Sequence, residues 1–299
     1  MPDRILITGD FLRPALDHWA PSQHFNIRWL QQILSAQIRL VCGVTPEMLA
    51  WSDHSVDGGL SSKDIAQFYE LLDAPQTIDG WAKISHLSDL PSEAEAFLAK
   101  KLSGALLIGF ETPRVVEDFV AKHGLTLIDM TIHPVRFMDD IFLGMRTNNR
   151  AMNETLARYA IDEALISLAA GVQSAAAQRE LAFRPIDGAL LFLMQVREDR
   201  SQISEGAFIY PQAYQRELQD LFAAYEHVYI KRHPFQQAPA TFDYLMDLGA
   251  SVEETDLNLY RLMATSQIAG VGSFSSSASY EAVYFGKQPH FILQPPNRF

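Results

Sequence analysis

Four clusters of polar residues follow apolar runs typical of buried strands, and each could do chemistry. The first spans residues 195–203, directly after the apolar run 189–194. Polar groups after a strand end commonly face a ligand, so Asp199, or its neighbour Glu198, could serve as a nucleophile or base. A solvated loop with charges of both signs is the plainer interpretation, and spacing alone favours it. Gln195 opens the same segment.

The second cluster is a basic turn, Lys231-Arg232-His233-Pro234, after the run 227–230. Two cations and a histidine at a strand end suit a phosphate group, and proline fixes the turn. A basic surface turn without a ligand fits the local sequence equally well.

The third cluster is a loop of small residues that leads into a helix and includes Ser275, Ser276 and Ser277. Backbone N–H groups and hydroxyls at a helix start can bind an anion, whereas the plainer alternative is a serine cap. The loop has neither the P-loop lysine nor a G-x-G-x-x-G pattern, so it indicates a phosphate site of no standard NTPase type. Glu281, one turn inside the helix, could reach a ribose or simply favour the helix start.

The fourth cluster lies in the first half, where Glu111 stands between a strand end and a helix start. It could be a catalytic base or an ordinary acid of a first helical turn. Downstream, His133 and the pair Asp139-Asp140 could line an acceptor site. A metal at that pair is disfavoured because adjacent residues rarely aim at one ion. The sequence has no H-x-x-x-H, cysteine-rich or G-x-S-x-G pattern, which disfavours zinc and an α/β-hydrolase.

The elements around these clusters alternate between strands and helices, which predicts an α/β fold with parallel sheets. A turn near residues 183–188 precedes a restart of the pattern, so we expect domains 1–183 and 184–299 facing across a cleft. The predicted strands are 4–8, 38–41, 105–108, 125–128, 189–194, 227–231, 250–252, 267–270 and 290–293. The predicted helices are 113–123, 153–180, 212–225, 256–265 and 277–285.

The composition fits this organisation. The chain has 299 residues, 48% hydrophobic and 20% charged, which suits about two globular domains. A net charge of −12 opposes broad binding of a phosphate backbone, so we expect no nucleic-acid partner. Cys42 is the single cysteine, which excludes an internal disulfide. Without a signal-like start or an apolar run of about 18 residues, the sequence predicts a soluble, cytoplasmic protein.

Taken in order, these clusters resemble the capsule polysaccharide biosynthesis family, above all its retaining β-Kdo transferases. An apolar strand leads into Gln-x-x-x-Asp at 195–199, and another leads into Lys-x-His-Pro at 231–234. A serine loop then opens a helix with an aromatic-Glu-Ala step, Tyr280-Glu281-Ala282, and a Gly-Lys at 286–287. The resemblance covers roughly residues 189–289. In the first half only Glu111 matches, and weakly.

The resemblance implies a GT-B fold and a CMP-activated ulosonic acid donor, with no cofactor and no metal. The resemblance further implies that His233 and Ser276 hold the CMP phosphate, with Lys231, Gln195 and the neighbouring serines beside them. Asp199 is the implied nucleophile in a double displacement, and Glu111 is the base that activates the acceptor hydroxyl. The implied acceptor is a glycan or lipid-linked glycan, which implies peripheral contact with the inner membrane.

Departures from the family pattern keep alternatives open. The loop after Asp199 is one residue longer than expected, which leaves Glu198 as an alternative nucleophile. The chain ends soon after its last strand, where GT-B enzymes often add a helix. A UDP- or GDP-sugar donor would suit the same phosphate-binding residues, the serine loop and the His-Pro turn. A non-catalytic nucleotide- or glycan-binding subunit is a further hypothesis, and a sugar epimerase is the least favoured.

Overall fold

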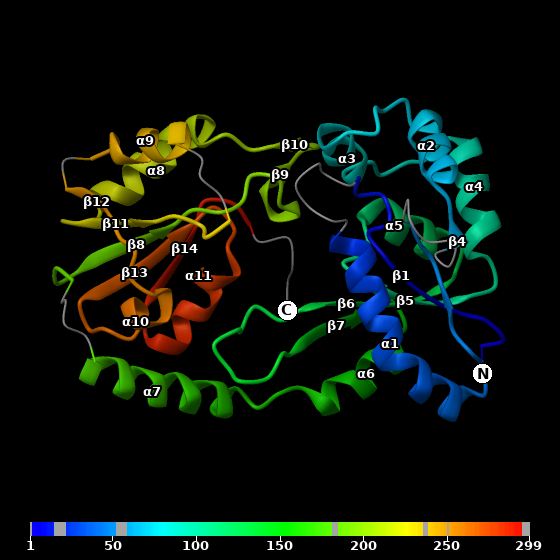
Figure 1. The fold of residues 1–299 in the computed structure, drawn as a ribbon, viewed down its shortest axis with the longest axis horizontal. Helices are drawn as coiled ribbons and strands as arrows, with labels where there is room; N and C mark the ends of the chain where they lie inside the picture. The colour runs from blue at the N-terminus through cyan, green and yellow to red at the C-terminus, as the bar shows by residue number, and fades with distance from the viewer. Residues whose placement is uncertain are drawn as a thin grey trace. The chain divides into compact units, whose positions relative to one another are not determined.

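A computed structural model describes residues 2–14, 22–51, 59–180, 185–235, 239–249 and 251–294. The chain divides into two compact units, each an α/β fold around a mainly parallel sheet (Figure 1). The first unit comprises Met1–Ile132, Leu143–Ala160 and Glu205–Ala207, and the second His133–Phe142, Ile161–Ser204 and Phe208–Phe299. Two Rossmann-like units in one chain confirm the expected α/β, GT-B-like fold class.

The boundary between the units differs from the predicted one. Residue 183 itself lies outside the described residues, but the helix before it already belongs to the second unit. The predicted helix 153–180 is in fact α6 (Arg150–Leu156), the short η2 (Ala157–Tyr159) and α7 (Glu163–Glu180). A new helix starts here because the Asp162 carboxylate accepts a hydrogen bond from Ala164 N at 2.9 Å. The sequence therefore changes unit near residue 160.

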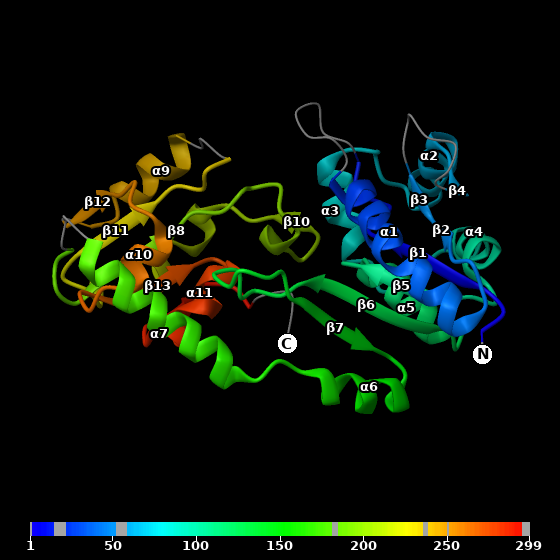
Figure 2. The same cartoon turned by 60° about the horizontal axis from the view of Figure 1, so that its bottom comes forward.

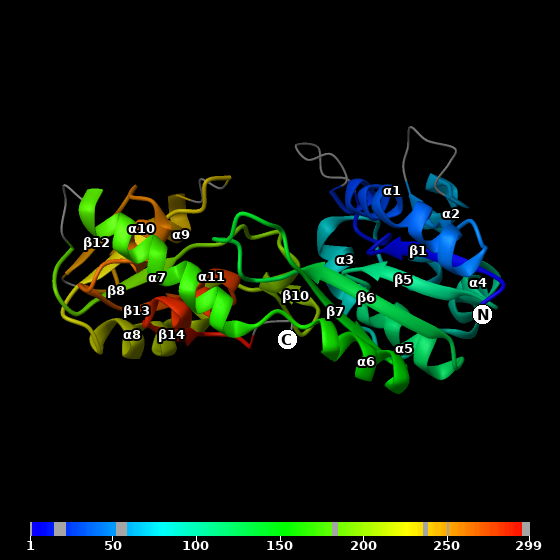
Figure 3. The ribbon, with the colours of Figure 1, turned by 90° about the horizontal axis from the view of Figure 1, so that it is seen from below.

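The first unit is built on five strands in the order β2-β1-β5-β6-β7, of which only β7 is antiparallel to its neighbour. Figure 3 shows α1 on one side of this sheet and α5 on the other. The elements are β1 (Ile5–Gly9), α1 (Ser22–Cys42), β2 (Glu47–Met48), β3 (Ala50–Trp51), β4 (Gly59–Leu60), α2 (Ser62–Leu71), α3 (Ile78–Ser85), α4 (Ser92–Leu102), β5 (Leu106–Phe110), α5 (Arg114–Lys122), β6 (Thr126–Ile132), β7 (Leu143–Thr147) and α6. Strands β3 and β4 form a separate two-stranded sheet.

The strand predicted at 38–41 is wrong, because these residues end helix α1. The apolar run belongs to a longer helical pattern, Ile27, Leu30, Leu34 and Ile38, at spacings of three and four. These side chains pack on the sheet with Ile7 and its neighbours. A short apolar run cannot by itself distinguish a strand from a segment of buried helix.

The second unit has a fully parallel sheet in the order β12-β11-β8-β13-β14. Its main elements are α7, β8 (Ala189–Leu193), α8 (Gln215–Ala223), β11 (Val228–Lys231), α9 (Pro239–Met246), β12 (Val252–Glu254), α10 (Leu259–Met263), β13 (Ile268–Ser273), α11 (Ser277–Glu281) and β14 (Gln288–Phe291). Shorter pieces are η3 (Arg200–Gln202), β9 (Ile203–Ser204), η4 (Pro211–Tyr214) and η5 (Ala282–Phe285), whereas β10 (Ala207–Phe208) begins in the first unit and ends in the second. The strands predicted here are present within a few residues, although the cap of α10 is Asn258 rather than Asp256. Position 250 of the predicted strand 250–252 lies outside the described residues.

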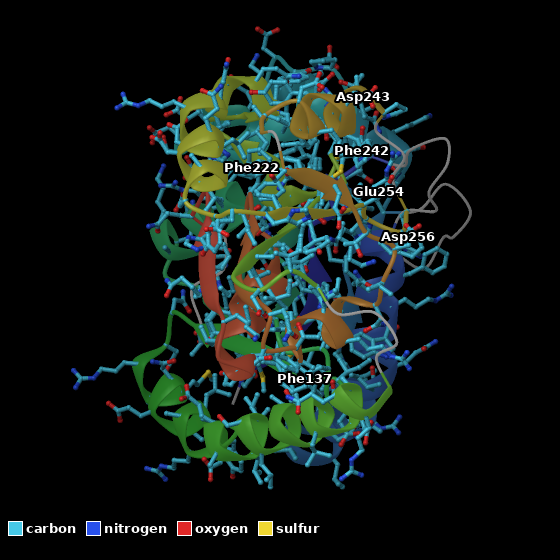
Figure 4. The ribbon with its side chains drawn as sticks, turned by 90° about the vertical axis from the view of Figure 1, so that its left-hand side faces the viewer. Phe137, Phe222, Phe242, Asp243, Glu254 and Asp256 are labelled. Atoms are coloured by element: carbon cyan, nitrogen blue, oxygen red, sulfur yellow. The ribbon has the colours of Figure 1, made fainter. Side chains whose placement is uncertain are left out.

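Helices cover both faces of the second sheet. Alternate residues of β8 divide between two cores, because successive side chains of a strand point to opposite faces. Leu190 and Phe192 pack with α8 and α9, whereas Leu191 and Leu193 pack with α7, α10 and α11. Figure 2 shows α7 and α10 together on one side, and Figure 4 shows Phe222 and Phe242 across the sheet from Phe137.

Candidate functional site

The second sheet reverses its winding between β8 and β13. Strand β8 is the first strand of this sheet along the chain, and it lies between the second strand, β11, and the fourth, β13. This is the 3-2-1-4-5 part of a dinucleotide-binding topology, whose ligands sit beyond the carboxyl ends of the strands at that switch point. The predicted residues Gln195 and Ser275 directly follow the two strands that flank it.

Gln195 and Ser275 are in direct contact there. Ser275 N donates to Gln195 Oε1 at 2.8 Å, and Gln195 Nε2 lies 3.3 Å from Ser275 Oγ and 3.1 Å from Ser201 Oγ. Gln202 Nε2 donates to Ser275 Oγ at 3.0 Å, and that hydroxyl donates to Ser201 O at 2.5 Å. We call Gln195, Ser201, Gln202 and Ser275 the glutamine clasp. It joins the loops on the two sides of the switch point.

The clasp uses most of the polar groups of Ser275, which is 3% exposed. In this structure Ser275 therefore supports the loop, and Ser276 and Ser277 are the partly exposed serines next to it. Gln202, also buried, was not among the predicted site residues. Its pairing with a serine 73 positions away has no local sequence signal.

Breaking the clasp should destabilise the second unit. Gln195→Leu leaves the buried Ser275 N–H without its acceptor, and such a group typically costs about 1–3 kcal/mol. Urea unfolding of Gln195→Leu should show this loss, whereas Gln219→Leu on the exposed side of α8 should not. Equal stability of the two variants would contradict a structural role for the clasp.

The serine loop continues into α11 through a second set of hydrogen bonds. Ser276 Oγ accepts from Ala278 N at 3.2 Å and caps the helix, as the plainer sequence interpretation has it. Ser276 N donates to Ser273 Oγ at 2.9 Å, and Ser273 and Ser279 share a buried hydroxyl contact at 2.7 Å. The backbone of the loop is thereby fixed while Ser277 keeps part of its surface.

The loops after β8 and β11 end at the same edge as the serine loop. Burial lowers the pKa of the His233 imidazole, and the nearby Asp199 charge acts in the opposite direction. Burial likewise lowers the pKa of Lys231, again against a nearby carboxylate, Asp256. An anionic ligand would raise both pKa values again, because an added negative charge favours the protonated forms of His233 and Lys231.

Asp199 is exposed and keeps its carboxylate close to the backbone. Its Oδ1 accepts from Ser201 N at 2.8 Å and caps the short helix η3. The neighbouring Glu198 lies 3.9 Å from the Arg197 guanidinium and is partly buried. Of the two acids, Asp199 is the one whose charge reaches His233.

Glu281 is the most buried acid of the predicted set, at 1% exposure. Arg136 N donates to its Oε1 at 2.6 Å, and Tyr260 OH lies 3.3 Å from both carboxylate oxygens. Burial raises the pKa of Glu281 to about 7, partly offset by these donors. A ribose contact would have to compete with Tyr260 for the same oxygens, and it stays a prediction.

A cavity of about 160 Å³ opens beside the clasp. Gln195, Gln202 and Arg197 contribute polar groups, and Arg197 Nη2 also donates to Tyr210 OH at 2.8 Å. The rest of the lining is Phe192, Met194, Ile209, Tyr210, Pro211, Thr241, Leu245 and Phe274. A cavity of about 150 Å³ accommodates one benzene ring, so this one has room for a single six-membered ring.

Glu111 occupies the corresponding position in the first unit. It follows β5, which lies beside β1 where that sheet changes winding direction. Its backbone has a positive φ of 52°, which is uncommon for a residue with a side chain. Gln23 Nε2 donates to Glu111 Oε2 at 2.9 Å, and Thr131 Oγ1 lies 3.3 Å from Glu111 Oε1. Gln23, in the first turn of α1, was not among the predicted residues.

No group of three or more histidine, cysteine, aspartate or glutamate side chains in the described ranges is arranged to hold a metal ion, Asp139 and Asp140 included. None of the described helices is long and apolar enough to cross a membrane.

Comparison with known proteins gives distant structural likenesses. No family model matches the chain, and no curated protein matches it in sequence. The β-Kdo 2,7 transferase KpsC of Thermosulfurimonas dismutans is similar over 66% of this chain and 67% of its own, with 13% identity and a TM-score of 0.41. A UDP-GlcNAc 2-epimerase of Methanocaldococcus jannaschii, solved with UDP-GlcNAc and UDP, is similar over 85% of this chain and 78% of its own, with 13% identity and a TM-score of 0.31.

Proposed function

We propose that this protein is a glycosyltransferase that moves Kdo, or a related ulosonic acid, from its CMP derivative to a glycan acceptor with retention of configuration. One observation carries the proposal. The loops after the adjacent strands β11, β8 and β13 bring Lys231, His233, Asp199 and the serines to one edge of the second sheet, at its switch point. Each loop holds one of the three motifs that resemble the family.

Phosphate binding is assigned to the cationic and hydroxyl groups of this edge. Lys231, His233, Ser276 and Ser277 would hold the phosphate of CMP. Because burial depresses the pKa values of Lys231 and His233, an anion beside them restores their charge. These charges would stabilise the phosphate as CMP leaves, without requiring a metal.

The carboxylates are assigned the two displacement steps. In the first, an Asp199 oxygen bonds to the anomeric carbon while the bond from that carbon to the CMP phosphate breaks, and CMP leaves with the electron pair. In the second, the acceptor hydroxyl oxygen displaces Asp199 from the opposite side, so the two inversions give retention. Glu111 of the first unit would take the hydroxyl proton.

Nucleotide binding gives the test. A panel of CMP, UDP, GDP, TDP and ADP should raise the melting temperature with CMP, since a ligand at about 100 times its Kd adds about 2.7 kcal/mol to the native state. His233→Ala should weaken CMP binding about 10- to 100-fold, because a hydrogen bond to a charged group contributes about 1.5–3 kcal/mol. His123→Ala, on the exposed side of the first unit, should leave it unchanged.

Other outcomes of the panel would redirect the proposal. A shift with UDP or GDP and none with CMP would overturn the donor and the double displacement. CMP binding without any turnover would favour a non-catalytic nucleotide-binding subunit. No shift with any nucleotide would contradict the assignment of this edge as a donor site.

A further inference from the structure

Helix α1 exposes large apolar side chains that no described residue covers. Leu40 is 86% exposed, Val41 68%, Phe25 53% and Ile33 39%, although all four lie in one helix of 21 residues. Phe25, Ile33 and Leu40 lie within an arc of about 80° around the helix, since seven residues make almost two turns and eight make slightly more. The opposite side, which includes Ile27 and Leu30, is fully buried on the sheet.

A further exposed apolar side chain lies on the face of the sheet that α1 covers. Met145 of β7 is 45% exposed and pairs with Met130 of β6. Residues paired directly across two strands point to the same face, and Met130 packs in the core beneath α1. Met145 therefore faces the same side of the sheet as α1. We call Phe25, Ile33 and Leu40 the α1 patch.

The charge of α1 indicates what would cover the patch. Helix α1 contains Arg28 and Arg39, both exposed, and no aspartate or glutamate over residues 22–42. This is a positive segment in a chain of net charge −12. An exposed apolar stripe beside arginines is the pattern of a helix that lies in the interface of an anionic membrane.

Helix α7 also exposes a row of apolar side chains. Leu165, Leu168 and Val172 of α7 are 57–65% exposed, and α7 begins with Glu163 and carries its one arginine, Arg179, in its last turn. The two helices therefore expose similar amounts of apolar side chain. They differ in charge, because α1 has two exposed arginines and no acidic residue. Charge distinguishes the expected partner of α1 from that of α7.

We propose that the α1 patch docks this protein on an anionic lipid surface. The outer face of α1 would sink its apolar side chains into the headgroup region, with Arg28 and Arg39 at lipid phosphates. Helix α1 also begins beside Glu111, because Gln23 in its first turn contacts that carboxylate. The further consequence, that a lipid-linked acceptor is presented to Glu111, rests on the proposed function.

Vesicle binding tests the docking directly. The full chain should co-sediment with vesicles of phosphatidylcholine containing phosphatidylglycerol and much less with phosphatidylcholine alone. Phe25→Asp with Leu40→Asp should reduce binding at least tenfold. Arg28→Gln with Arg39→Gln should weaken binding to the anionic vesicles about 30-fold. The matched control, Leu165→Asp with Leu168→Asp on α7, should bind as the parent does.

A second measurement locates the contact. Cys42 ends α1, is partly exposed, and is the single cysteine of the chain, so an environment-sensitive fluorophore attached there should shift to the blue when anionic vesicles are added. No binding to anionic vesicles would overturn the proposal. So would vesicle binding that survives the α1 variants, or self-association that is lost with Leu40→Asp, since the patch would then serve a second copy.

The nucleotide panel keeps this test separate from that of the donor site. Loss of vesicle binding with a persistent CMP shift would reject only the lipid contact. Vesicle binding without any nucleotide shift would reject the proposed function and leave the contact standing.

Discussion

Replacing Asp199 by asparagine should abolish sugar transfer and leave nucleotide binding intact. Asparagine keeps an Oδ1 atom that can accept the 2.8 Å hydrogen bond from Ser201 N, so the cap of η3 is retained. It cannot form a stable ester with the anomeric carbon. Loss of a nucleophile can cost about 10⁶-fold in turnover, and we expect a fall of at least about 10⁴-fold with a CMP-ulosonic acid donor.

Glu198→Gln is the control for this prediction. Glu198 is the adjacent acid but lies beside Arg197, and its replacement should leave most of the turnover. Intact-mass measurement with donor and no acceptor should show one added sugar on the parent chain and on Glu198→Gln, but none on Asp199→Asn. If Glu198→Gln is the inactive variant, the nucleophile is its neighbour. If Asp199→Asn keeps near-normal turnover, the double displacement through this residue is wrong.

The positions of the site residues follow from strand ends, which the sequence marks clearly. The apolar runs before Gln195, Lys231 and the serine loop are predicted as buried strands because each is short and followed by polar residues. Parallel strands in one sheet end at one edge, so the α/β pattern was enough to expect these loops to be neighbours. The same logic located Glu111 after β5.

The contacts of the site depend on strand order, which no local pattern contains. Gln195 meets Ser275 because β8 lies beside β13, and Gln202 joins them across 73 positions. Gln23 approaches Glu111 because α1 packs over the β1–β5 pair. A polar residue in such a place has the same local sequence as one in a solvated loop. Its function is therefore visible only when the two loops are brought together.

The raised pKa of Glu281 could not be predicted from its local sequence either. Its local sequence is that of an ordinary acid near a helix start. One donor to its carboxylate, Arg136 N, is 145 positions away in the connection between β6 and β7. Phe137, the next residue, is buried among Tyr260, Tyr284 and Phe285. The acid is therefore desolvated by a segment that the helix pattern does not predict.

Glu281→Gln should stabilise the second unit at alkaline pH and change little at pH 4 to 5. The carboxyl pKa is about 7 in the folded chain, above its usual 4.5, so the folded state holds a proton that the unfolded chain releases between these values. The stabilisation of the folded state by that proton is fully present below pH 4.5, is lost as the pH rises from 4.5 to 7, and is absent at higher pH. The difference of about 2.5 pKa units corresponds to about 3 kcal/mol at pH 8 and above.

The neighbouring charges set the size of this effect. Arg136 and the hydrogen bonds from Arg136 N and Tyr260 favour the ionised carboxylate, while burial opposes it more strongly. Tyr260 and Tyr284 have raised pKa values and stay neutral through this range, and Glu163 lies near Tyr284. Glutamine retains an oxygen for Arg136 N and carries no charge, so the variant avoids the free-energy cost of ionising a buried carboxyl. Its gain in stability is reduced by the hydrogen-bond energy that the ionised carboxylate would have contributed.

Thermal unfolding of parent and variant at pH 4.5 and pH 8.5 measures the difference. The gap between the two melting temperatures should be small at the lower pH and favour Glu281→Gln at the higher one. Glu217→Gln, an exposed acid of α8, should track the parent at both. A gap that is the same at both pH values would mean that the folded carboxyl titrates normally.

The same variant tests whether Glu281 contacts the ribose, because glutamine also keeps the Arg136 contact. A fall in CMP affinity with intact stability would place Glu281 at the ligand. Unchanged CMP affinity would make Glu281 an internal anchor for the segment 133–142.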